Sequence, residues 1–165
     1  MTATRSVFCR LFQAGKDKKR KEDTVSELVR IQLEDFSIDS EVKKVMASSK
    51  GIGGVTVFLG AARDFSKGES ITGLDFEHYP GMAEKKLVDI RDRALKNFDI
   101  IEMSIVHRVG KIDIGENIVL IVAASAHRND AFMACEWAIT ELKRTTPIWK
   151  RETTGKGDVW VSQTP

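Results

Sequence analysis

Two stretches of the chain repeat apolar residues every three or four positions, which is the spacing of one face of a helix. The first follows Pro80 and Gly81, and its apolar stripe consists of Ala83, Leu87, Ile90, Ala94 and Phe98. The second runs from about Asn129 to Lys143 and is stopped by Pro147; its inward residues are Ala131, Cys135, Ala138 and Leu142. These patterns predict two long helices that each bury one side.

A third, shorter helix is predicted after Ser37, because either Ser37 or Asp39 can cap its first turn. Its apolar face consists of Val42, Val45 and Met46. The segment then runs into the glycines at positions 51, 53 and 54, which end the helical pattern.

Alternating or continuous apolar residues predict strands in the remaining segments. The predicted strands are Val29–Asp35, Gly54–Gly60, Ile71–Tyr79, Ile101–Gly110 and Ile118–Ala126, followed by a hairpin of Ile148–Glu152 with Asp158–Ser162. Residues 62–70 are polar and predict a loop, and residues 111–117 predict a turn. Strands joined by hairpins, with two long helices, predict an α+β fold in which the helices pack together on a mostly antiparallel sheet.

Length and composition indicate one ordinary globular domain, with 165 residues, 42% of them hydrophobic and 30% charged. The net charge is only +2, so the molecule has no overall basic field for nucleic acid, and any anion site must be local. No apolar run reaches the roughly 20 residues that span a membrane, so no membrane partner is expected.

The cysteines and histidines suggest neither a disulfide framework nor a metal site. Cys9 and Cys135 are the only two cysteines, no CxxC spacing occurs, and the three histidines lie far apart. We therefore expect a protein of the reducing cytoplasm that binds no metal.

The first 24 residues differ in character from the rest of the chain. They carry Arg5 and Arg10 with no acidic residue before Asp17, followed by the charge run Lys16–Asp23. This composition resembles a short transit peptide, although a tail or docking helix is the simpler interpretation. We place the domain boundary near Val25, so residues 1–24 form an N-terminal extension and residues 25–165 form a single domain.

His127 and Arg128 stand where a predicted buried strand gives way to the second long helix. Such a junction directs unpaired backbone N–H groups and the positive end of the helix dipole outward. An imidazole and a guanidinium there would suit a phosphate or carboxylate. A surface arginine and a capping histidine explain the pattern equally well.

Cations gather at the far end of the same helix, where Lys143 and Arg144 are followed by Lys150 and Arg151. Lysine is favoured at a helix C-terminus by the dipole alone. Crowding by like charges, or burial, would instead lower the pKa of Lys143 and make it a nucleophile or general base. Glu152 could neutralise one of these cations.

Strand alternation separates Lys150 from Trp149, so that one face of this strand can contribute to the core and the other to a site. Arg63 follows a buried strand in a loop, where functional residues are common, although a solvated arginine is the simpler interpretation. Cys135 falls on an apolar helix face and His78 and His107 in strands, so all three are expected to be structural.

Several motifs follow one another in a long, ordered pattern between about residues 29 and 162. They are FEHYPGM, HRVG, SAHR, AFMAC, LKRTTPIWKRE and GDVW. In this pattern the chain resembles the large, catalytic subunit of molybdopterin synthase. The resemblance implies an α+β fold with a hammerhead-like β element.

The resemblance also implies an activity and its partners. The family converts cyclic pyranopterin monophosphate to molybdopterin by transferring sulfur that arrives as the C-terminal thiocarboxylate of a small ubiquitin-like subunit. Two large subunits form a homodimer at the centre of a heterotetramer, with no cofactor or metal required at this step. A docking partner without catalysis, or a phosphate- or RNA-binding module, remains the alternative.

The resemblance assigns roles by motif. Lys143 and Lys150 match the two active-site lysines, with Lys143 interpreted here as the main catalytic group. The residues that match substrate-binding positions are Arg63, His127, Arg128, Arg151 and Glu152, of which the His127–Arg128 pair can serve the neighbouring subunit's pocket. Two features depart from the pattern: Ala61 stands where some members carry a lysine, and the first 24 residues have no counterpart in the short members.

Overall fold

The computed structural model describes residues 25, 27–66 and 68–161. The predictions made for residues 1–24, including those for Arg5, Arg10 and Cys9, lie outside these residues. The elements, in chain order, are β1 (Val29–Gln32), α2 (Ile38–Met46), β2 (Gly54–Ala61), β3 (Phe65–Ser66), β4 (Glu69–His78), α3 (Met82–Asn97), β5 (Ile100–Arg108), β6 (Gly110–Ile112), β7 (Asn117–Ser125), α4 (Arg128–Thr145), β8 (Ile148–Thr154) and β9 (Gly157–Val161).

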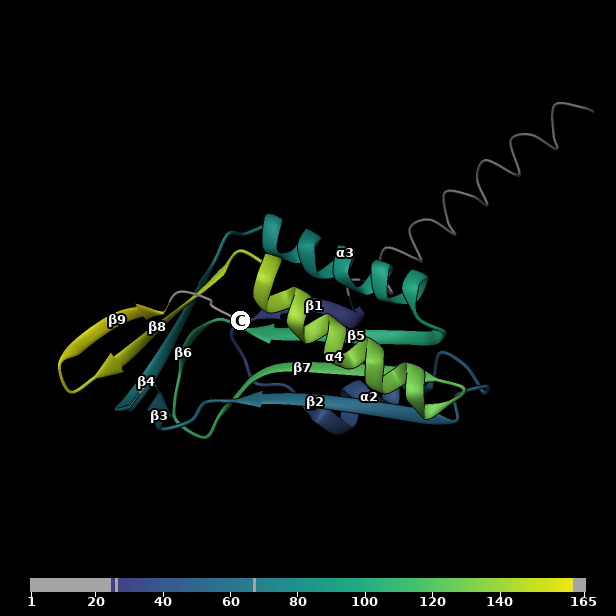
Figure 1. Ribbon diagram of the computed structural model, residues 1–165, viewed down its shortest axis with the longest axis horizontal. Coiled ribbons are helices and arrows are strands. Elements are labelled where there is room, and N and C mark those ends of the chain that lie inside the picture. The colour runs from purple at the N-terminus through teal and green to yellow at the C-terminus, as the bar shows by residue number, and fades with distance from the viewer. Residues whose placement is uncertain (1–24, 26, 67, 162–165) are drawn as a thin grey trace, which may run out of the picture.

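A four-stranded sheet with the order β1-β5-β7-β2 forms the body of the molecule. Its β1–β5 pair is parallel, and its other two pairs are antiparallel. Helices α3 and α4 pack together on one side of this sheet, with α2 on the other (Figure 1). Residues 119–124 of the central strand β7 are therefore all buried, which explains why this segment is almost wholly apolar.

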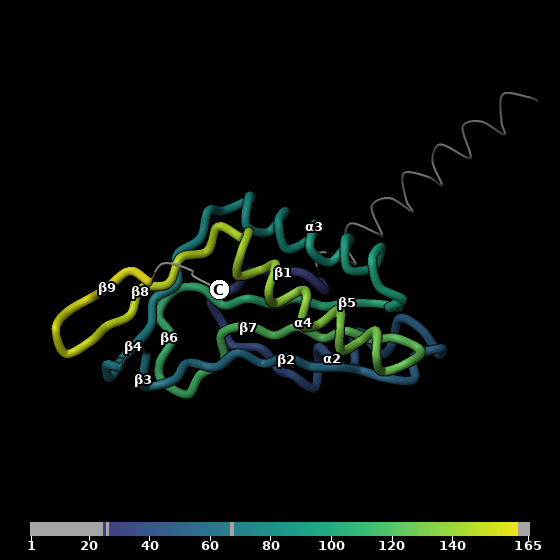
Figure 2. The backbone as a smooth tube through the Cα atoms, in the orientation of Figure 1, coloured from purple at the N-terminus to yellow at the C-terminus, as the bar shows by residue number. Residues whose placement is uncertain are grey.

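The second sheet has the order β3-β4-β8-β9, with β6 also paired to β4. Figure 2 shows it projecting past the end of the first sheet, with the β8–β9 hairpin at the far end of the molecule. All its strand pairs are antiparallel. The predicted α+β class, with a mostly antiparallel sheet and two long packed helices, is confirmed.

The helices begin and end for local reasons that are visible in the sequence. Ser37 caps α2 by accepting a hydrogen bond from the Ser40 N–H at 3.2 Å. At the start of α3, Gly81 has a φ of 78°, and its N–H donates to the Glu84 carboxylate at 2.6 Å. Helix α4 ends at Thr145, two residues before Pro147, as expected.

Two contacts fix α4 against α3. Arg93 of α3 donates to the Glu141 carboxylate at 3.0 Å, and its guanidinium lies over the Trp137 ring, 5.0 Å from the ring centre. The carboxylate of Glu141 also accepts hydrogen bonds from Arg144. The last turns of α4 are thus held in a set position beside the second sheet.

Two short strands were missed by the sequence prediction. The expected turn at residues 111–117 begins inside β6, and the expected loop at residues 62–70 contains β3. Both strands are two or three residues long, too short for an alternating pattern to show. Gly110 has a φ of 79°, and the short strand that it begins pairs with β4, which depends on a distant part of the chain.

Candidate functional site

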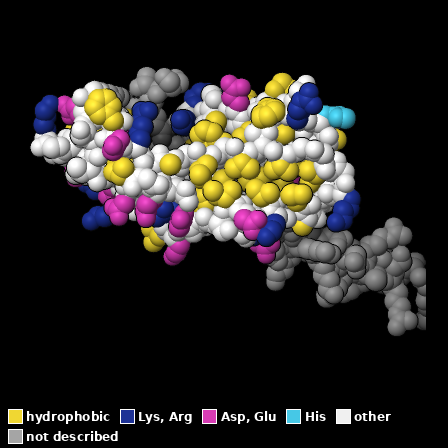
Figure 3. All heavy atoms as spheres, turned by 90° about the horizontal axis from the view of Figure 1, so that it is seen from below, with side chains coloured by type: hydrophobic (Ala, Val, Ile, Leu, Met, Phe, Trp, Pro, Cys, Tyr) yellow, Lys and Arg dark blue, Asp and Glu magenta, His cyan; other side chains and the backbone are white. Residues whose placement is uncertain are grey.

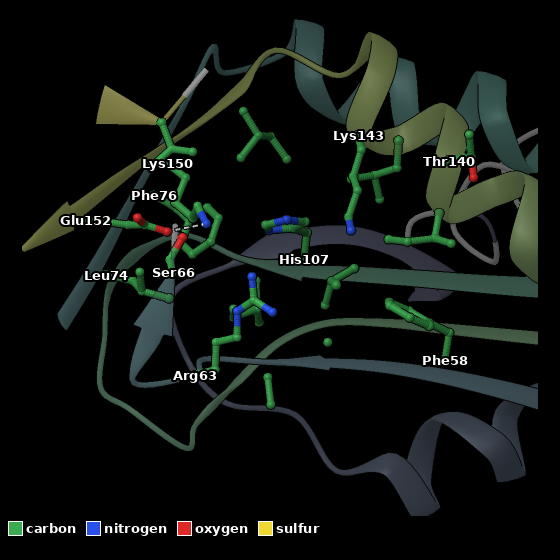
Figure 4. A pocket seen from close by; sticks show the side chains of 18 of the residues that line it. Phe58, Arg63, Ser66, Leu74, Phe76, His107, Thr140, Lys143, Lys150 and Glu152 are labelled. Carbon is green, nitrogen blue, oxygen red and sulfur yellow. Dashed lines mark hydrogen bonds and ion pairs between the residues drawn. The ribbon is translucent and has the colours of Figure 1, made fainter. Parts of the chain in front are cut away.

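A cavity of about 890 Å³ lies where the last turns of α4 approach the end of β2 and the inner face of the second sheet (Figure 4). Much of its wall is apolar and comes from the two hydrophobic clusters of the core. The charged residues of the wall are Arg63, Lys143, Arg144, Lys150 and Glu152. Four of the seven residues predicted from the sequence as site residues therefore meet in one place.

Lys143 reaches the cavity from the last turns of α4, and its amino group points into the open space in Figure 4. No described residue forms a hydrogen bond or an ion pair with this amino group. The neighbouring Arg144 is held by Glu141 at 2.8 Å, so the crowding of cations expected around Lys143 is partly relieved. Lys143 remains a cation available to a ligand.

Lys150 and Glu152 project from the same face of β8 and form an ion pair of 2.6 Å. Glu152 is buried, so it holds the lysine against the cavity wall. Lys150 does point away from Trp149, as expected, but the core residue Ile148 shares its face. The expectation that core and site occupy opposite faces of this strand is wrong, because the cavity opens beside the smaller core cluster and the Trp149 face lies at the surface.

Arg63 lies just after β2 and lines the cavity across from Lys143 and Lys150 (Figure 4). In the described part of the chain it has no hydrogen-bond or ion-pair partner. Among the described residues, the cavity wall therefore has four cations, Arg63, Lys143, Arg144 and Lys150, and one carboxylate, that of Glu152. Of these cations, Arg144 is already paired with Glu141. This charge balance suits an anionic ligand.

Arg151 lies outside the cavity. It projects from the opposite face of β8, where it forms an ion pair of 2.5 Å with Asp75 and lies 5.4 Å from the Trp160 ring centre. Its hydrogen bond to Asp75 raises the pKa of the guanidinium. The structure thus does not bring Arg151 to the other predicted site residues.

His127 and Arg128 are also absent from the cavity wall, because they lie at the N-terminal end of α4. Helix α4 has 18 residues, so its two ends are about 27 Å apart at 1.5 Å per residue. Both side chains are exposed, and no described residue is hydrogen-bonded or ion-paired to either of them. His127 occupies the N-cap position, but its side chain makes no capping hydrogen bond.

His107 is the cavity residue that sequence reasoning interpreted as structural only. It is buried in β5 and lines the cavity wall, where its ring meets the Phe76 ring at a centroid distance of 5.5 Å. Its placement depends on how β5 and the second sheet meet, and the alternating pattern of the strand gives no signal of that. Ser66 and Thr140, which also line the cavity, were missed for the same reason.

Within residues 25, 27–66 and 68–161, no group of three His, Cys, Asp or Glu side chains could hold a metal ion. In the same part of the chain, no helix is both long and apolar enough to cross a membrane.

Comparison with known proteins identifies relatives over most of the chain. The family model described as "MoaE protein" matches residues 31–145. The molybdopterin synthase catalytic subunit of Ralstonia nicotianae is 41% identical over 133 residues, which are 81% of this chain and 76% of the relative.

Solved structures agree with this result. Molybdopterin synthase from Staphylococcus aureus superposes with a TM-score of 0.77 at 36% identity, over 82% of this chain and 97% of that one. A complex of subunits 1 and 2 of the molybdopterin-converting factor from Helicobacter pylori has a TM-score of 0.67 at 22% identity, over 82% of this chain and 90% of that one, and shows the shared fold alone. The chain therefore belongs to the MoaE family, the catalytic subunits of molybdopterin synthase in molybdenum cofactor biosynthesis.

Proposed function

We propose that this chain transfers sulfur from the C-terminal thiocarboxylate of a small ubiquitin-like subunit to cyclic pyranopterin monophosphate, forming the dithiolene of molybdopterin. The observation that carries the proposal is the cavity in which Lys143 and Arg63 have no acidic partner among the described residues. Both ligands of the proposed reaction are anions, and each would be attracted to these cations.

Lys143 is the main catalytic group in this proposal. Sulfur transfer breaks the bond between sulfur and the acyl carbon of the partner's tail, and negative charge develops at the reacting atoms. A lysine that points into the cavity without a competing carboxylate can stabilise that charge, move a proton or contact the acyl carbon. Lys150 assists by charge stabilisation, and its ion pair with Glu152 fixes where its charge lies.

The positions of His127 and Arg128 support a second copy of the chain as part of the site. About 27 Å of helix separates them from their own cavity, so a phosphate held there cannot also lie beside Lys143 of the same copy. In a two-fold dimer each pair could instead complete the partner's cavity. Arg63, Lys143 and Lys150 would then come from one copy, and His127 and Arg128 from the other.

Strand β2 is a suitable place for the two copies to meet. It is an edge strand of the first sheet, and Val57 and Leu59 on it are exposed. Figure 3 views the molecule from below, the side towards which β2 lies in Figure 1, and shows apolar side chains gathered on that face. Contiguous patches of this kind are typical of interfaces.

The two ends of β2 lie beside the two halves of the proposed site. Its first residue, Gly54, is against Arg128, since an added Cβ would lie 3.3 Å from the Arg128 Cα. Its last residue, Ala61, is two positions before Arg63. Antiparallel pairing of β2 with its symmetry copy would therefore bring Arg128 of one copy towards Arg63 and the cavity of the other.

The extent of the domain is also part of the proposal. We propose that residues 25–165 form one catalytic unit and that residues 1–24 are an extension outside it. The family match, which begins at residue 31, supports a boundary before that position.

Reconstitution tests the function directly. The full chain is mixed with a thiocarboxylated small partner and cyclic pyranopterin monophosphate, and dithiolene product is measured. The same partner with an ordinary C-terminal carboxylate is the matched control and should give no product. Binding of the thiocarboxylated partner without any turnover of the pterin would overturn the proposal in favour of a docking protein.

A further inference from the structure

His107 is a buried polar side chain in the cavity wall. It is 4% exposed and belongs to β5, whereas the cations around it come from the loop after β2, from α4 and from β8. Figure 4 shows its ring on the cavity side of β5, between the side chains of Lys143 and Lys150. A side chain so placed can contact a ligand that fills the cavity.

The hydrogen bond of one ring nitrogen fixes the tautomer of this histidine. Nδ1 lies 2.6 Å from the backbone carbonyl oxygen of Arg108. A carbonyl only accepts, so Nδ1 carries the hydrogen and donates it. Burial lowers the pKa of His107 to about 4; the hydrogen bond to Arg108 partly opposes this shift, and nearby His78 adds to it. The ring is therefore neutral near pH 7, and its Nε2 is a hydrogen-bond acceptor.

The other charged groups of the cavity leave this acceptor without a partner. Lys150 donates its hydrogen bond to Glu152, and Arg144 donates to Glu141. Arg63 and Lys143 form no hydrogen bond with any described residue, so none of the cavity's cations donates to His107. Within the described residues, nothing donates to Nε2 of His107. The cavity thus combines cations, which suit an anion, with one fixed neutral acceptor, which suits a ligand N–H or O–H.

We propose that His107 is a specificity-determining residue whose Nε2 accepts a hydrogen bond from an N–H or O–H group of the heterocyclic part of the substrate. This inference rests on the proposed function. A phosphate and a thiocarboxylate both present lone pairs and would be repelled by the lone pair of Nε2. The heterocycle carries donors, so His107 would fix which end of the substrate enters the cavity.

Two substitutions separate this role from a structural one. In His107→Asn the side-chain amide nitrogen can replace Nδ1 and keep the bond to the Arg108 carbonyl, but the acceptor at Nε2 is lost. In His107→Gln the amide oxygen can replace Nε2, but the bond to the carbonyl is lost. A structural role predicts that Asn is tolerated and Gln is harmful, and the proposed role predicts the reverse.

The measurements are pterin affinity and kcat/KM of the complete complex. We expect His107→Asn to weaken both roughly tenfold, the effect of losing one buried hydrogen bond. His107→Gln should stay within a few-fold of wild type, and affinity for the small partner should not change in either variant. Wild-type behaviour of the Asn variant, or a loss confined to partner affinity, would overturn the assignment.

A measurement on the unaltered protein covers the case in which a variant does not fold. With ¹⁵N-labelled histidine, the Nε2 resonance of His107 should shift when pterin is added and stay unchanged with sulfate, an anion that carries no O–H donor at neutral pH. An unchanged resonance with pterin bound would overturn the inference. Product formation by the wild-type complex is scored separately, so failure of the proposed function is distinguishable from failure of this assignment.

Discussion

The two ends of α4 carry the same kind of residue in very different surroundings. Lys143, at the C-terminal end, points into a cavity shared with Arg63 and Lys150. His127 and Arg128, at the N-terminal end, are exposed and outside that cavity. In sequence the two groups belong to one continuous motif-rich segment, yet a rigid helix holds them about 27 Å apart.

This difference teaches that closeness in sequence does not bring cations together when a long helix separates them. The C-terminal end contributes residues to the wall of a cavity that forms within one copy. The N-terminal end has His127 and Arg128 exposed with no described side-chain partner, and we propose that a second copy of the chain brings them to its own cavity.

The largest effect is expected at the C-terminal end. Lys143→Ala should lower the single-turnover rate at least about 10²-fold, as is typical when a positioned acid–base group is lost. Binding of the small partner should survive, because a docking interface distributes its energy over other contacts. Rapid-quench measurement of the rate and calorimetry of partner binding check both parts.

Lys96→Ala provides the matched control for this substitution. Lys96 also lies in the last turn of a long helix, α3, but it does not line the cavity. The Lys96→Ala variant should therefore turn over the substrate at the wild-type rate. If Lys143→Ala is as active as Lys96→Ala, the catalytic group is another residue, and a dead Lys150→Ala would reverse the assignment of the two lysines.

Mixing the variants Lys143→Ala and Arg128→Ala tests whether the ends of α4 cooperate across copies. In a dimer of Lys143→Ala with Arg128→Ala, one cavity carries both defects and the other carries neither. When equal amounts exchange at random, about half of the dimers are mixed, and each mixed dimer has one intact cavity out of two. Total activity should therefore return to about a quarter of the wild-type value. The readout is product formed after subunit exchange, with each variant alone as a control. Activity no higher than the average of the two variants would place both residues in the site of a single copy.

A smaller effect should distinguish the two faces of β8. Lys150→Ala removes a cation from the cavity and should weaken pterin binding by roughly tenfold, with less effect on turnover. Arg151→Ala removes a cation from the opposite face, where Asp75 already pairs with it, and should change affinity no more than about twofold. Equal losses in the two variants would mean that the outer face also contacts the substrate.

Much of the fold was predictable because local patterns decide it. The apolar stripes of α3 and α4, the cap at Ser37 and the break before Pro147 are all properties of neighbouring residues. Strands β3 and β6 were not predictable, because each consists of two or three residues whose pairing with β4 depends on residues far away in the chain.

The site was predictable as a set of residue types but not as an arrangement. The motif pattern singled out Arg63, Lys143 and Lys150, which the fold does bring to one cavity. It also grouped Arg151 with them, although strand alternation sends that side chain to the opposite face. His107 was missed because its role depends on which sheet lies against β5, and a single histidine in an apolar strand looks structural.

The buried His107 of β5, in the wall of the cavity, also predicts an effect of pH on stability. Burial lowers the pKa of His107 from its ordinary 6.5 to about 4. Between these values the unfolded chain binds a proton that the folded chain does not, so the free energy of unfolding falls as the pH falls. Relative to His107→Gln, the wild type should lose on the order of 3 kcal/mol from pH 7 to pH 4, measured by urea unfolding at fixed protein concentration. Parallel pH profiles would show that the imidazole is already charged or solvated in the folded protein.

The smallest effect is expected in the middle of α4, between its two contrasting ends. Cys135 is buried there, and its thiol lies 3.9 Å from the carbonyl oxygen of Ile121. Burial raises the pKa of the thiol to about 11, so near neutral pH it is protonated and a poor nucleophile. A thiol in this state is unsuited to carrying sulfur between the partner's tail and the pterin.

Cys135→Ala should therefore keep full turnover and lose only about 1 kcal/mol of stability, the effect of removing one buried heavy atom. Product formation and urea unfolding of the same preparation check the two parts. Cys135→Ser is the useful companion, since it preserves size but buries a hydroxyl, and it should be the less stable of the two. A stable Cys135→Ala protein that binds both substrates and forms no product would make this thiol part of the chemistry, and the middle of α4 would then be as functional as its ends.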